Sequence, residues 1–154
     1  MTIKHNILPV VFCLMLTACH SDRIYFAFQS LPDAGWNKDS LLTYTYEVQD
    51  TTASYDILLH IRHNERYPYQ NLWLYIVHET EQTFDTIEFY LADDRGRWLG
   101  NGRNGTREMP VILEENYRFT QSGNHTLTIR HGMRQDKLKG VMDVGVEISS
   151  HEQE

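Results

Sequence analysis

The feature that most constrains the fold of this chain is an alternation of apolar and polar residues with a period of two. Between residues 42 and 48, leucine, tyrosine and valine side chains alternate with threonine and glutamate. Successive side chains of a β-strand point to opposite faces of a sheet, so this run predicts a strand with one buried and one exposed face. Further strands are expected at residues 55–62, 72–78, 84–91, 98–99, 109–113, 117–119, 125–130 and 141–148.

Turn signals separate these runs. Asp93-Asp94-Arg95-Gly96 and Ser122-Gly123-Asn124 combine short polar side chains with glycine, which is typical of tight turns. Residues 100–108 are expected to form a loop, and residues 132–140 a loop or a single helical turn. No segment has the period of an amphipathic helix. The sequence therefore predicts an all-β fold, an antiparallel β-sandwich of jelly-roll or immunoglobulin-like type, with roughly eight strands over residues 40–150.

The amino terminus carries an apolar stretch from Ile7 to Ala18. At about 1.5 Å per residue this stretch is too short to cross a hydrocarbon core of about 30 Å as a helix, which is typical of a signal peptide. It ends in Leu16-Thr17-Ala18-Cys19, which resembles a bacterial lipobox. The resemblance implies cleavage before Cys19 and a lipid on its sulfur. Residues 1–18 are then a lipoprotein signal peptide and residues 19–39 a lipidated tether, with a plain secreted protein as the alternative.

Composition excludes several classes of function. Removing residues 1–18, whose one charged side chain is Lys4, shortens the chain from 154 to 136 residues and changes the formal charge from −7 to −8. Such an acidic surface argues against a nucleic-acid partner and against adhesion to anionic headgroups, so the lipid on Cys19 is the expected membrane contact. The two cysteines, Cys13 and Cys19, are lost to cleavage and to lipid. No disulfide, cysteine nucleophile or cysteine-based zinc site is expected.

Candidate catalytic and metal-binding residues give weak signals. The histidines at positions 60, 63 and 78 lack the spacing of a zinc site, and no Gly-x-Ser-x-Gly motif of a serine hydrolase occurs. We expect no metal, no cofactor and no enzymatic activity. Two pairs of carboxylates remain open as candidates for glycoside hydrolysis: Glu79 with Glu81, and Glu114 with Glu115.

Four groups of residues after the lipobox are similar to the GldH family of gliding-motility lipoproteins of the Bacteroidota. They are residues 32–38, 67–72, 91–100 and 143–148. The resemblance implies a non-enzymatic lipoprotein of the cell envelope that serves gliding or the associated type IX secretion pathway. Its partners would be other envelope lipoproteins or secretion and gliding proteins. His20 stands where an aspartate would signal inner-membrane retention, which favours the outer membrane. The single acid at Asp22 is too little to indicate export to the cell surface, so the periplasmic face is expected.

A carbohydrate-binding module is the alternative function. Sugar rings stack on exposed indole and phenol rings, and a β-sandwich offers surfaces for such stacking. The residues that would form a glycan surface, or a surface for a protein partner, are Trp36, Tyr67, Tyr69, Trp73 and Trp98. A row of exposed rings would favour the glycan, whereas buried rings would favour the assembly function.

Overall fold

The computed structural model describes residues 22–151, which form β-strands and no helix. No helix in this part of the chain is therefore available to cross a bilayer. The strands are β1 (Arg23–Ser30), β2 (Trp36–Asn37), β3 (Leu42–Val48), β4 (Tyr55–Asn64), β5 (Asn71–His78), β6 (Thr83–Tyr90), β7 (Asn101–Arg103), β8 (Thr106–Tyr117), β9 (Gly123–His131), β10 (Lys137–Leu138) and β11 (Val141–Ser150).

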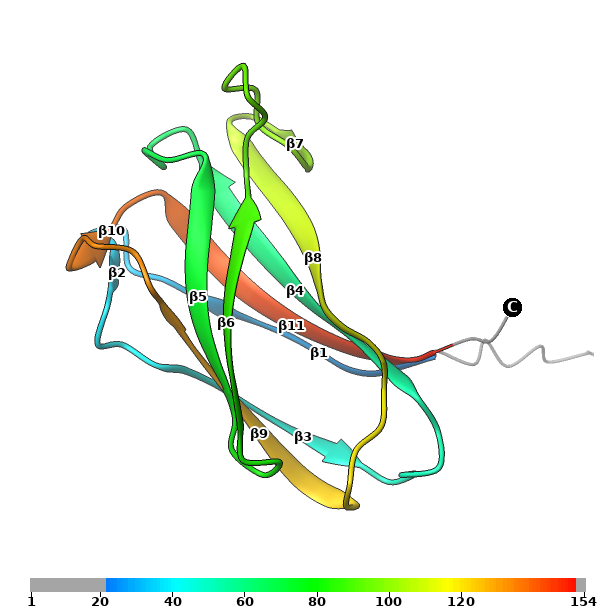
Figure 1. Cartoon of the computed structure of the whole chain (residues 1–154). Helices are drawn as coiled ribbons and strands as arrows, with labels where there is room; N and C mark the ends of the chain where they lie inside the picture. The colour runs from blue at the N-terminus through cyan, green and yellow to red at the C-terminus, as the bar shows by residue number, and fades with distance from the viewer. Residues whose placement is uncertain (1–21, 152–154) are drawn as a thin grey trace, which may run out of the picture.

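Two antiparallel sheets face each other (Figure 1). The large sheet has the order β1-β11-β4-β8-β7 and the small sheet the order β3-β9-β5-β6, while β2 and β10 pair as a short ribbon. The predicted all-β antiparallel sandwich is thus confirmed. The structure has more strands than expected because β1, β2, β7 and β10 lie in segments predicted to be tether, loop or helical turn. The strand expected at residues 98–99 is reduced to an isolated bridge between Trp98 and Ala92.

The core lies between the two sheets and follows the predicted alternation. In β3, residues 42, 44, 46 and 48 are buried and the residues between them are exposed. In β5 the even-numbered residues are buried, and in β6 Ile87 and Phe89 face inward. Tyr44 spans the core, because its hydroxyl donates a hydrogen bond to the carbonyl of Val144 on the opposite sheet at 2.7 Å.

Part of the expected tether belongs to the sandwich. Residues 23–30 form β1, which pairs with β11 along its whole length apart from a register shift near Tyr25. The physical reason is packing: the Tyr25 ring lies 5.5 Å from that of Tyr46, and the Phe28 ring lies over Gly145, where a side chain would collide with it. Cys19 and the proposed signal peptide lie outside the described residues.

The segment after β6 also differs from expectation. Residues 106–117 form one continuous strand, β8, where two short strands were expected. β7 and β8 are joined by a tight turn at Asn104 and Gly105, both of which have positive φ. These two residues occupy the conformation that a short hairpin requires, so part of the expected loop becomes a hairpin.

The sandwich has two distinct ends. The terminal end carries Asp22 and His151, which hydrogen-bond to Ser150 and Ser54, together with the turns at 49–54, 79–82 and 118–122. The loop end carries the connections at 31–41, 65–70, 91–100 and 132–140. β1 runs from the terminal end to the loop end (Figure 1).

Candidate functional site

The five predicted aromatic residues do not form one exposed surface. Trp36 and Tyr67 are buried, and Tyr69 and Trp98 are half-buried against the core at the loop end. Trp73 is 37% exposed and lies apart from them on the outer face of the small sheet. Trp36 and Tyr67 consequently have no ring face to offer a sugar or a partner, which corrects the expectation for these two residues.

Hydrogen bonds explain why the two buried rings stay inside. The Tyr67 hydroxyl donates to the carbonyl of Asn71 at 2.6 Å, and the Trp36 indole nitrogen donates to the carbonyl of Ser40 at 3.1 Å. Buried tyrosine and tryptophan residues need such partners for their polar atoms. Burial raises the pKa of Tyr67 above its ordinary value, so its hydroxyl remains a donor at neutral pH.

Three of the four groups that carry the family resemblance meet at the loop end. Gln70 accepts backbone hydrogen bonds from Leu91 and Ala92, which joins the second group to the third. Arg66, just before the second group, reaches Asp33 of the first group at 3.6 Å. The fourth group, residues 143–148, lies in β11 and runs toward the terminal end. Residues far apart in sequence therefore build one compact end of the molecule.

Two histidines also belong to this end. His63 was considered only as a metal ligand, and His131 was not among the predicted site residues. The His63 ring is buried and its centroid lies 4.6 Å from that of Trp98. The Nε2 atom of His131 lies 3.0 Å from the carbonyl oxygen of Trp36, so it donates a hydrogen bond there. Burial lowers the pKa of both histidines. We call Trp36, His63, Tyr67, Trp98 and His131 the end cluster.

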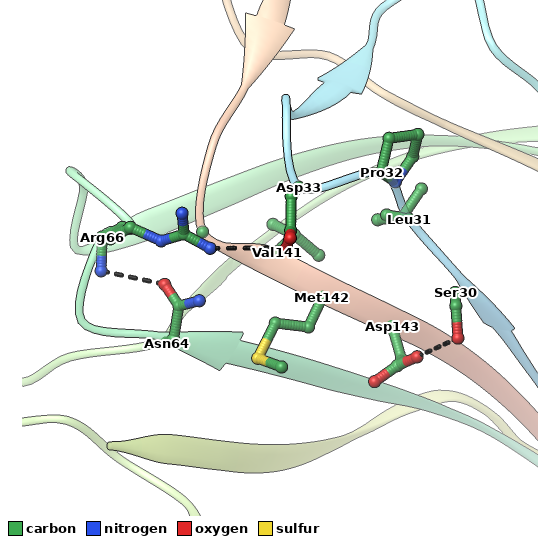
Figure 2. A pocket seen from close by; sticks show the side chains of 10 residues that line it. Ser30, Leu31, Pro32, Asp33, Asn64, Arg66, Val141, Met142 and Asp143 are labelled. Carbon is green, nitrogen blue, oxygen red and sulfur yellow. Dashed lines mark hydrogen bonds and ion pairs between the residues drawn. The ribbon is translucent and has the colours of Figure 1, made fainter.

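A cleft of about 170 Å³ opens beside the end cluster, between the end of β1 and the connection after β4 (Figure 2). Figure 2 shows that its polar groups are tied to one another: Arg66 faces Asp33, its backbone nitrogen donates to Asn64, and the Ser30 hydroxyl donates to Asp143 at 2.5 Å. These mutual contacts occupy polar groups of the residues that line the cleft.

A chain of alternating charges crosses the outer face of the large sheet. Arg23 contacts Glu147 at 2.7 Å, and Arg62 contacts Glu108 at 2.8 Å. His60 lies between the two carboxylates, with Nδ1 3.0 Å from Glu108 and Nε2 2.7 Å from Glu147. Burial acts to raise the pKa of Glu108, yet hydrogen bonds from Arg62 and His60 lower it below its ordinary value. The chain ties β1, β11, β4 and β8 together.

Exposed aromatic rings gather on the outer face of the small sheet. Phe84 and Tyr90 on β6 are 59% and 56% exposed, and Trp73 and Tyr75 stand beside them on β5. The Tyr75 and Phe84 rings stack at 6.0 Å, and the Arg130 guanidinium lies 4.8 Å from the centre of the Tyr75 ring. We call Trp73, Tyr75, Phe84 and Tyr90 the outer row. Of this row, only Trp73 was among the residues predicted to form a surface.

Two of the carboxylates left open for glycoside hydrolysis contact threonine side chains of neighbouring segments: Glu79 accepts a hydrogen bond from the Thr128 hydroxyl at 3.2 Å, and Glu81 contacts Thr120. Glu81 accepts hydrogen bonds from the backbone nitrogen and the hydroxyl of Thr120, which is a structural role in the turns of the terminal end. Burial raises the pKa of Glu114. Among residues 22–151, no three histidine, cysteine, aspartate or glutamate side chains are arranged to hold a metal ion.

Comparison with solved structures finds loose overlaps. A family GH115 4-O-methyl-α-glucuronidase, described as specific for decorated arabinogalactans, overlaps with 82% of this chain and 16% of its own at 12% identity and a TM-score of 0.46. The VP2 subviral particle of infectious bursal disease virus overlaps with 85% of this chain and 33% of its own at 14% identity and a TM-score of 0.36. Overlaps this loose carry no inference about function.

Comparison with characterised sequences is far more specific. The gliding motility lipoprotein GldH of Flavobacterium johnsoniae is 30% identical over 158 residues, covering 96% of this chain and 98% of its own. The GldH homolog of Christiangramia forsetii is 32% identical over 149 residues, covering 88% of each chain. The family model described as GldH lipoprotein matches residues 23–148, from the first strand to the last. The chain therefore belongs to the GldH lipoprotein family.

Proposed function

We propose that this protein is a lipoprotein anchored through Cys19 in the outer membrane, on its periplasmic face, and that it is a non-enzymatic component of the gliding or type IX secretion machinery. The observation that carries the proposal is the family match over residues 23–148, which spans the whole sandwich. The two relatives are named gliding motility lipoproteins or homologs of one. Several acyl chains on one cysteine would hold the domain at the membrane almost permanently.

The direction of β1 gives this anchoring a geometric consequence. Cys19 lies three residues before Asp22, which hydrogen-bonds to Ser150 at the terminal end. β1 then carries the chain over eight residues to the loop end, a distance of about 26 Å at roughly 3.3 Å per residue. The loop end, with its cleft and end cluster, would therefore face away from the membrane, where an assembly partner can reach it.

The burial of Trp36 and Tyr67 and the hydrogen bonds within the cleft support a role in assembly, whereas the exposed rings of the outer row favour the alternative, a carbohydrate-binding surface. The polar atoms of the end cluster hydrogen-bond to backbone carbonyls, and its rings pack against one another, as in a structural core. Anchoring would confine the domain near its partners and raise their effective concentration without any new contact. A component that acts by binding its partners needs this confinement and a binding surface.

Labelling cells with a fatty-acid analogue tests the anchor. We expect the wild-type protein and Cys13→Ala, a matched control in the signal peptide, to incorporate label and to sediment with envelopes. Cys19→Ala should lose the label. A Cys19→Ala protein that still sediments with envelopes, beside a wild type that takes up no label, would refute the anchoring.

Crosslinking of the native lipoprotein in envelope fractions tests the assembly role. Recovery of gliding or secretion components, identified by mass spectrometry, is the expected result. Specific retention of the protein on a polysaccharide column, with no such component recovered, would replace the assembly role with carbohydrate binding.

A further inference from the structure

Four strand edges border the two sheets, and three of them are protected. β1 has a register shift near Tyr25, and the neighbouring edge of β3 is capped where the Gln29 side chain donates to the Thr43 carbonyl at 2.6 Å. β7 is three residues long, and the part of β8 that extends beyond it contains Pro110 and pairs with β4 through shifted registers. Shifts, prolines and short strands are the usual devices that keep an edge from pairing with another chain.

The fourth edge, β6, has none of these devices. Its eight residues pair with β5 in one continuous register, and the strand contains no proline, glycine, lysine or arginine. Figure 1 shows β6 as the outermost strand of the small sheet. A long and regular edge without basic residues is a template for an added strand.

The hydrogen-bond pattern shows which backbone groups face the open edge. Leu91 donates to Gln70 across β6 and β5, and Gly132 donates to Trp73 across β9 and β5. Hydrogen-bonded and non-bonded pairs alternate along antiparallel strands, so the even-numbered residues of β5 bond to β6 and the odd-numbered residues bond to β9. The backbone N–H and C=O groups directed at the open edge therefore belong to Phe84, Thr86, Glu88 and Tyr90.

The same four residues carry side chains that point to the exposed outer face. Phe84 and Tyr90 extend the outer row to the edge, where an added strand would lie directly beside them. Glu88 accepts a hydrogen bond from the Asn71 side chain at 2.6 Å, and no lysine or arginine among residues 22–151 pairs with it. An incoming strand with an apolar or aromatic side chain near Phe84 or Tyr90 and a basic one near Glu88 complements this edge.

We propose that the β6 edge is a docking site for an extended segment of a protein partner, which adds a fifth strand to the small sheet. The backbone groups of Phe84, Thr86, Glu88 and Tyr90 supply the pairing. The outer row together with Glu88 selects a segment in which every second residue, on the face shared with these side chains, is apolar or basic. The site extends along β6 from the terminal end toward the loop end and shares no residue with the cleft of Figure 2.

A second copy of this chain is a poorer occupant. β6 runs from the terminal end toward the loop end, so antiparallel pairing of two β6 strands would place the two terminal ends on opposite sides of the dimer. If Cys19 anchors both copies in one membrane, as proposed above, both terminal ends face that membrane, and the two copies cannot pair in this antiparallel way. Parallel pairing would instead bring the Glu88 carboxylates of the two copies near each other.

Site-specific photocrosslinking in native cells tests the proposal, with a benzoylphenylalanine at position 86 of the full-length lipoprotein, which leaves Phe84, Glu88 and Tyr90 in place. A matched control carries the same probe at Ile112, which is 62% exposed on the large sheet. We expect the probe at 86 to give a product with another polypeptide, joined within a segment that has apolar and basic residues at every second position. A product that contains only this chain or a glycan, no product, or the same product from position 112 would overturn the proposal.

The variant Thr86→Pro tests whether backbone hydrogen bonds of the β6 edge bind the partner segment. The Thr86 N–H points to the open edge, so proline there removes a donor for the partner without removing a bond to β5. A peptide synthesised from the crosslinked segment should bind the wild-type lipoprotein in detergent, slow hydrogen exchange at residues 84, 86, 88 and 90, and bind Thr86→Pro about tenfold more weakly.

Folding of the variants is checked separately, by their thermal transitions. The double substitution Phe84→Lys and Tyr90→Lys keeps the backbone intact and places on β6 the charges that guard natural edges. This double variant should also abolish the crosslink and weaken the binding of the peptide. Undiminished binding by both folded variants would overturn the proposal. Because binding is measured in detergent, a failure of anchoring at Cys19 would leave this result unaffected.

Discussion

The end cluster and the outer row are both aromatic, yet they have opposite relations to solvent. In the end cluster, Trp36 and Tyr67 are buried and their polar atoms bond to backbone carbonyls. In the outer row, Phe84 and Tyr90 are more than half exposed on a strand with an open edge. Aromatic residues in the same small domain thus stabilise it in one place and present a surface in the other.

This difference shows that aromatic residues of this sandwich can serve either its packing or its surface. The end cluster lies among the residues that resemble the family, so much of that resemblance reflects packing of one end of the sandwich. The outer row is built mainly from residues outside those groups. A surface that binds a partner is free to differ among relatives, whereas a packed end is constrained by volume.

The largest expected effect separates the two regions directly. Trp36→Ala should lower the free energy of unfolding by about 3–5 kcal/mol, because it empties a fully buried site. Trp73→Ala, on the exposed face, should cost about 1 kcal/mol. Urea unfolding of both variants measures this, and equal losses would remove the distinction between end cluster and outer row.

Backbone geometry at the loop end predicts the next effect. Gly140 has φ +90°, and a Cβ there would lie 2.2 Å from the Tyr67 backbone nitrogen. Gly140→Ala should therefore cost about 2–4 kcal/mol, since both the conformation and the space are unsuitable. Gly96→Ala is the matched control: Gly96 also has positive φ, but nothing lies within 4 Å of its Cβ, so about 1 kcal/mol is expected. Similar unfolding midpoints for the two variants would contradict the tight contact.

The hydroxyl of Tyr67 provides a finer comparison. Tyr67→Phe leaves the Asn71 carbonyl without its donor and should cost about 1–2 kcal/mol. Tyr90→Phe, which removes an exposed hydroxyl from the outer row, should change the free energy of unfolding by less than about 0.5 kcal/mol. Thermal denaturation of the pair checks this, and a neutral Tyr67→Phe would show that the bond contributes nothing net.

Acid should destabilise the core through its buried histidines. Burial lowers the pKa of His63, His78 and His131. The unfolded chain then binds more protons than the folded protein between those lowered values and about pH 6.5, so the free energy of unfolding falls as the pH falls through this window. Above about pH 7 the three groups are neutral in both states and contribute no slope.

The variant His78→Phe isolates one of these groups. Neither ring nitrogen of His78 has a hydrogen-bond partner in the described part of the chain, so phenylalanine keeps the ring and removes the titration. Urea unfolding at about pH 5, 6 and 7.5 should show a smaller loss of stability for the variant than for the wild type. The same slope in both proteins would exclude a contribution from His78.

The smallest expected effect on stability lies in the outer row. Phe84→Lys should change the free energy of unfolding by about 0.5 kcal/mol or less, because the ring is 59% exposed. A loss as large as that of Trp36→Ala, measured in the same urea series, would show that the outer row is part of the core.

Sequence periodicity predicted the core residues reliably where one face of a strand is buried and the other is exposed to solvent. The alternation in residues 42–48 and 84–91 predicted which side chains enter the core, as β3 and β6 show. It failed for residues 23–30, because β1 is an edge strand that is mostly half-buried or exposed and its pattern is irregular. The hairpin of β7 and β8 was missed because its strand β7 has no buried residue to give a signal.

The candidate site was predictable only in part. The sequence singled out Trp36, Tyr67 and Trp98, and the structure brings them to one end with His63 and His131. Nothing in the local pattern distinguishes a buried tryptophan from an exposed one, since burial depends on strands that are distant in sequence. The open edge of β6 was equally hidden, because strand order is not encoded in any single run of residues.

By itself, the sequence determined the all-β character, the antiparallel sandwich and the family, because side-chain alternation and short motifs are local properties of the chain. Only the tertiary structure decided which aromatic rings are buried, that β1 belongs to the large sheet, and that β6 is left with a free edge. The physical reason is that burial and edge position follow from the order of the strands in each sheet. Most pairings, such as β11 with β4 and β4 with β8, join residues separated by tens of positions.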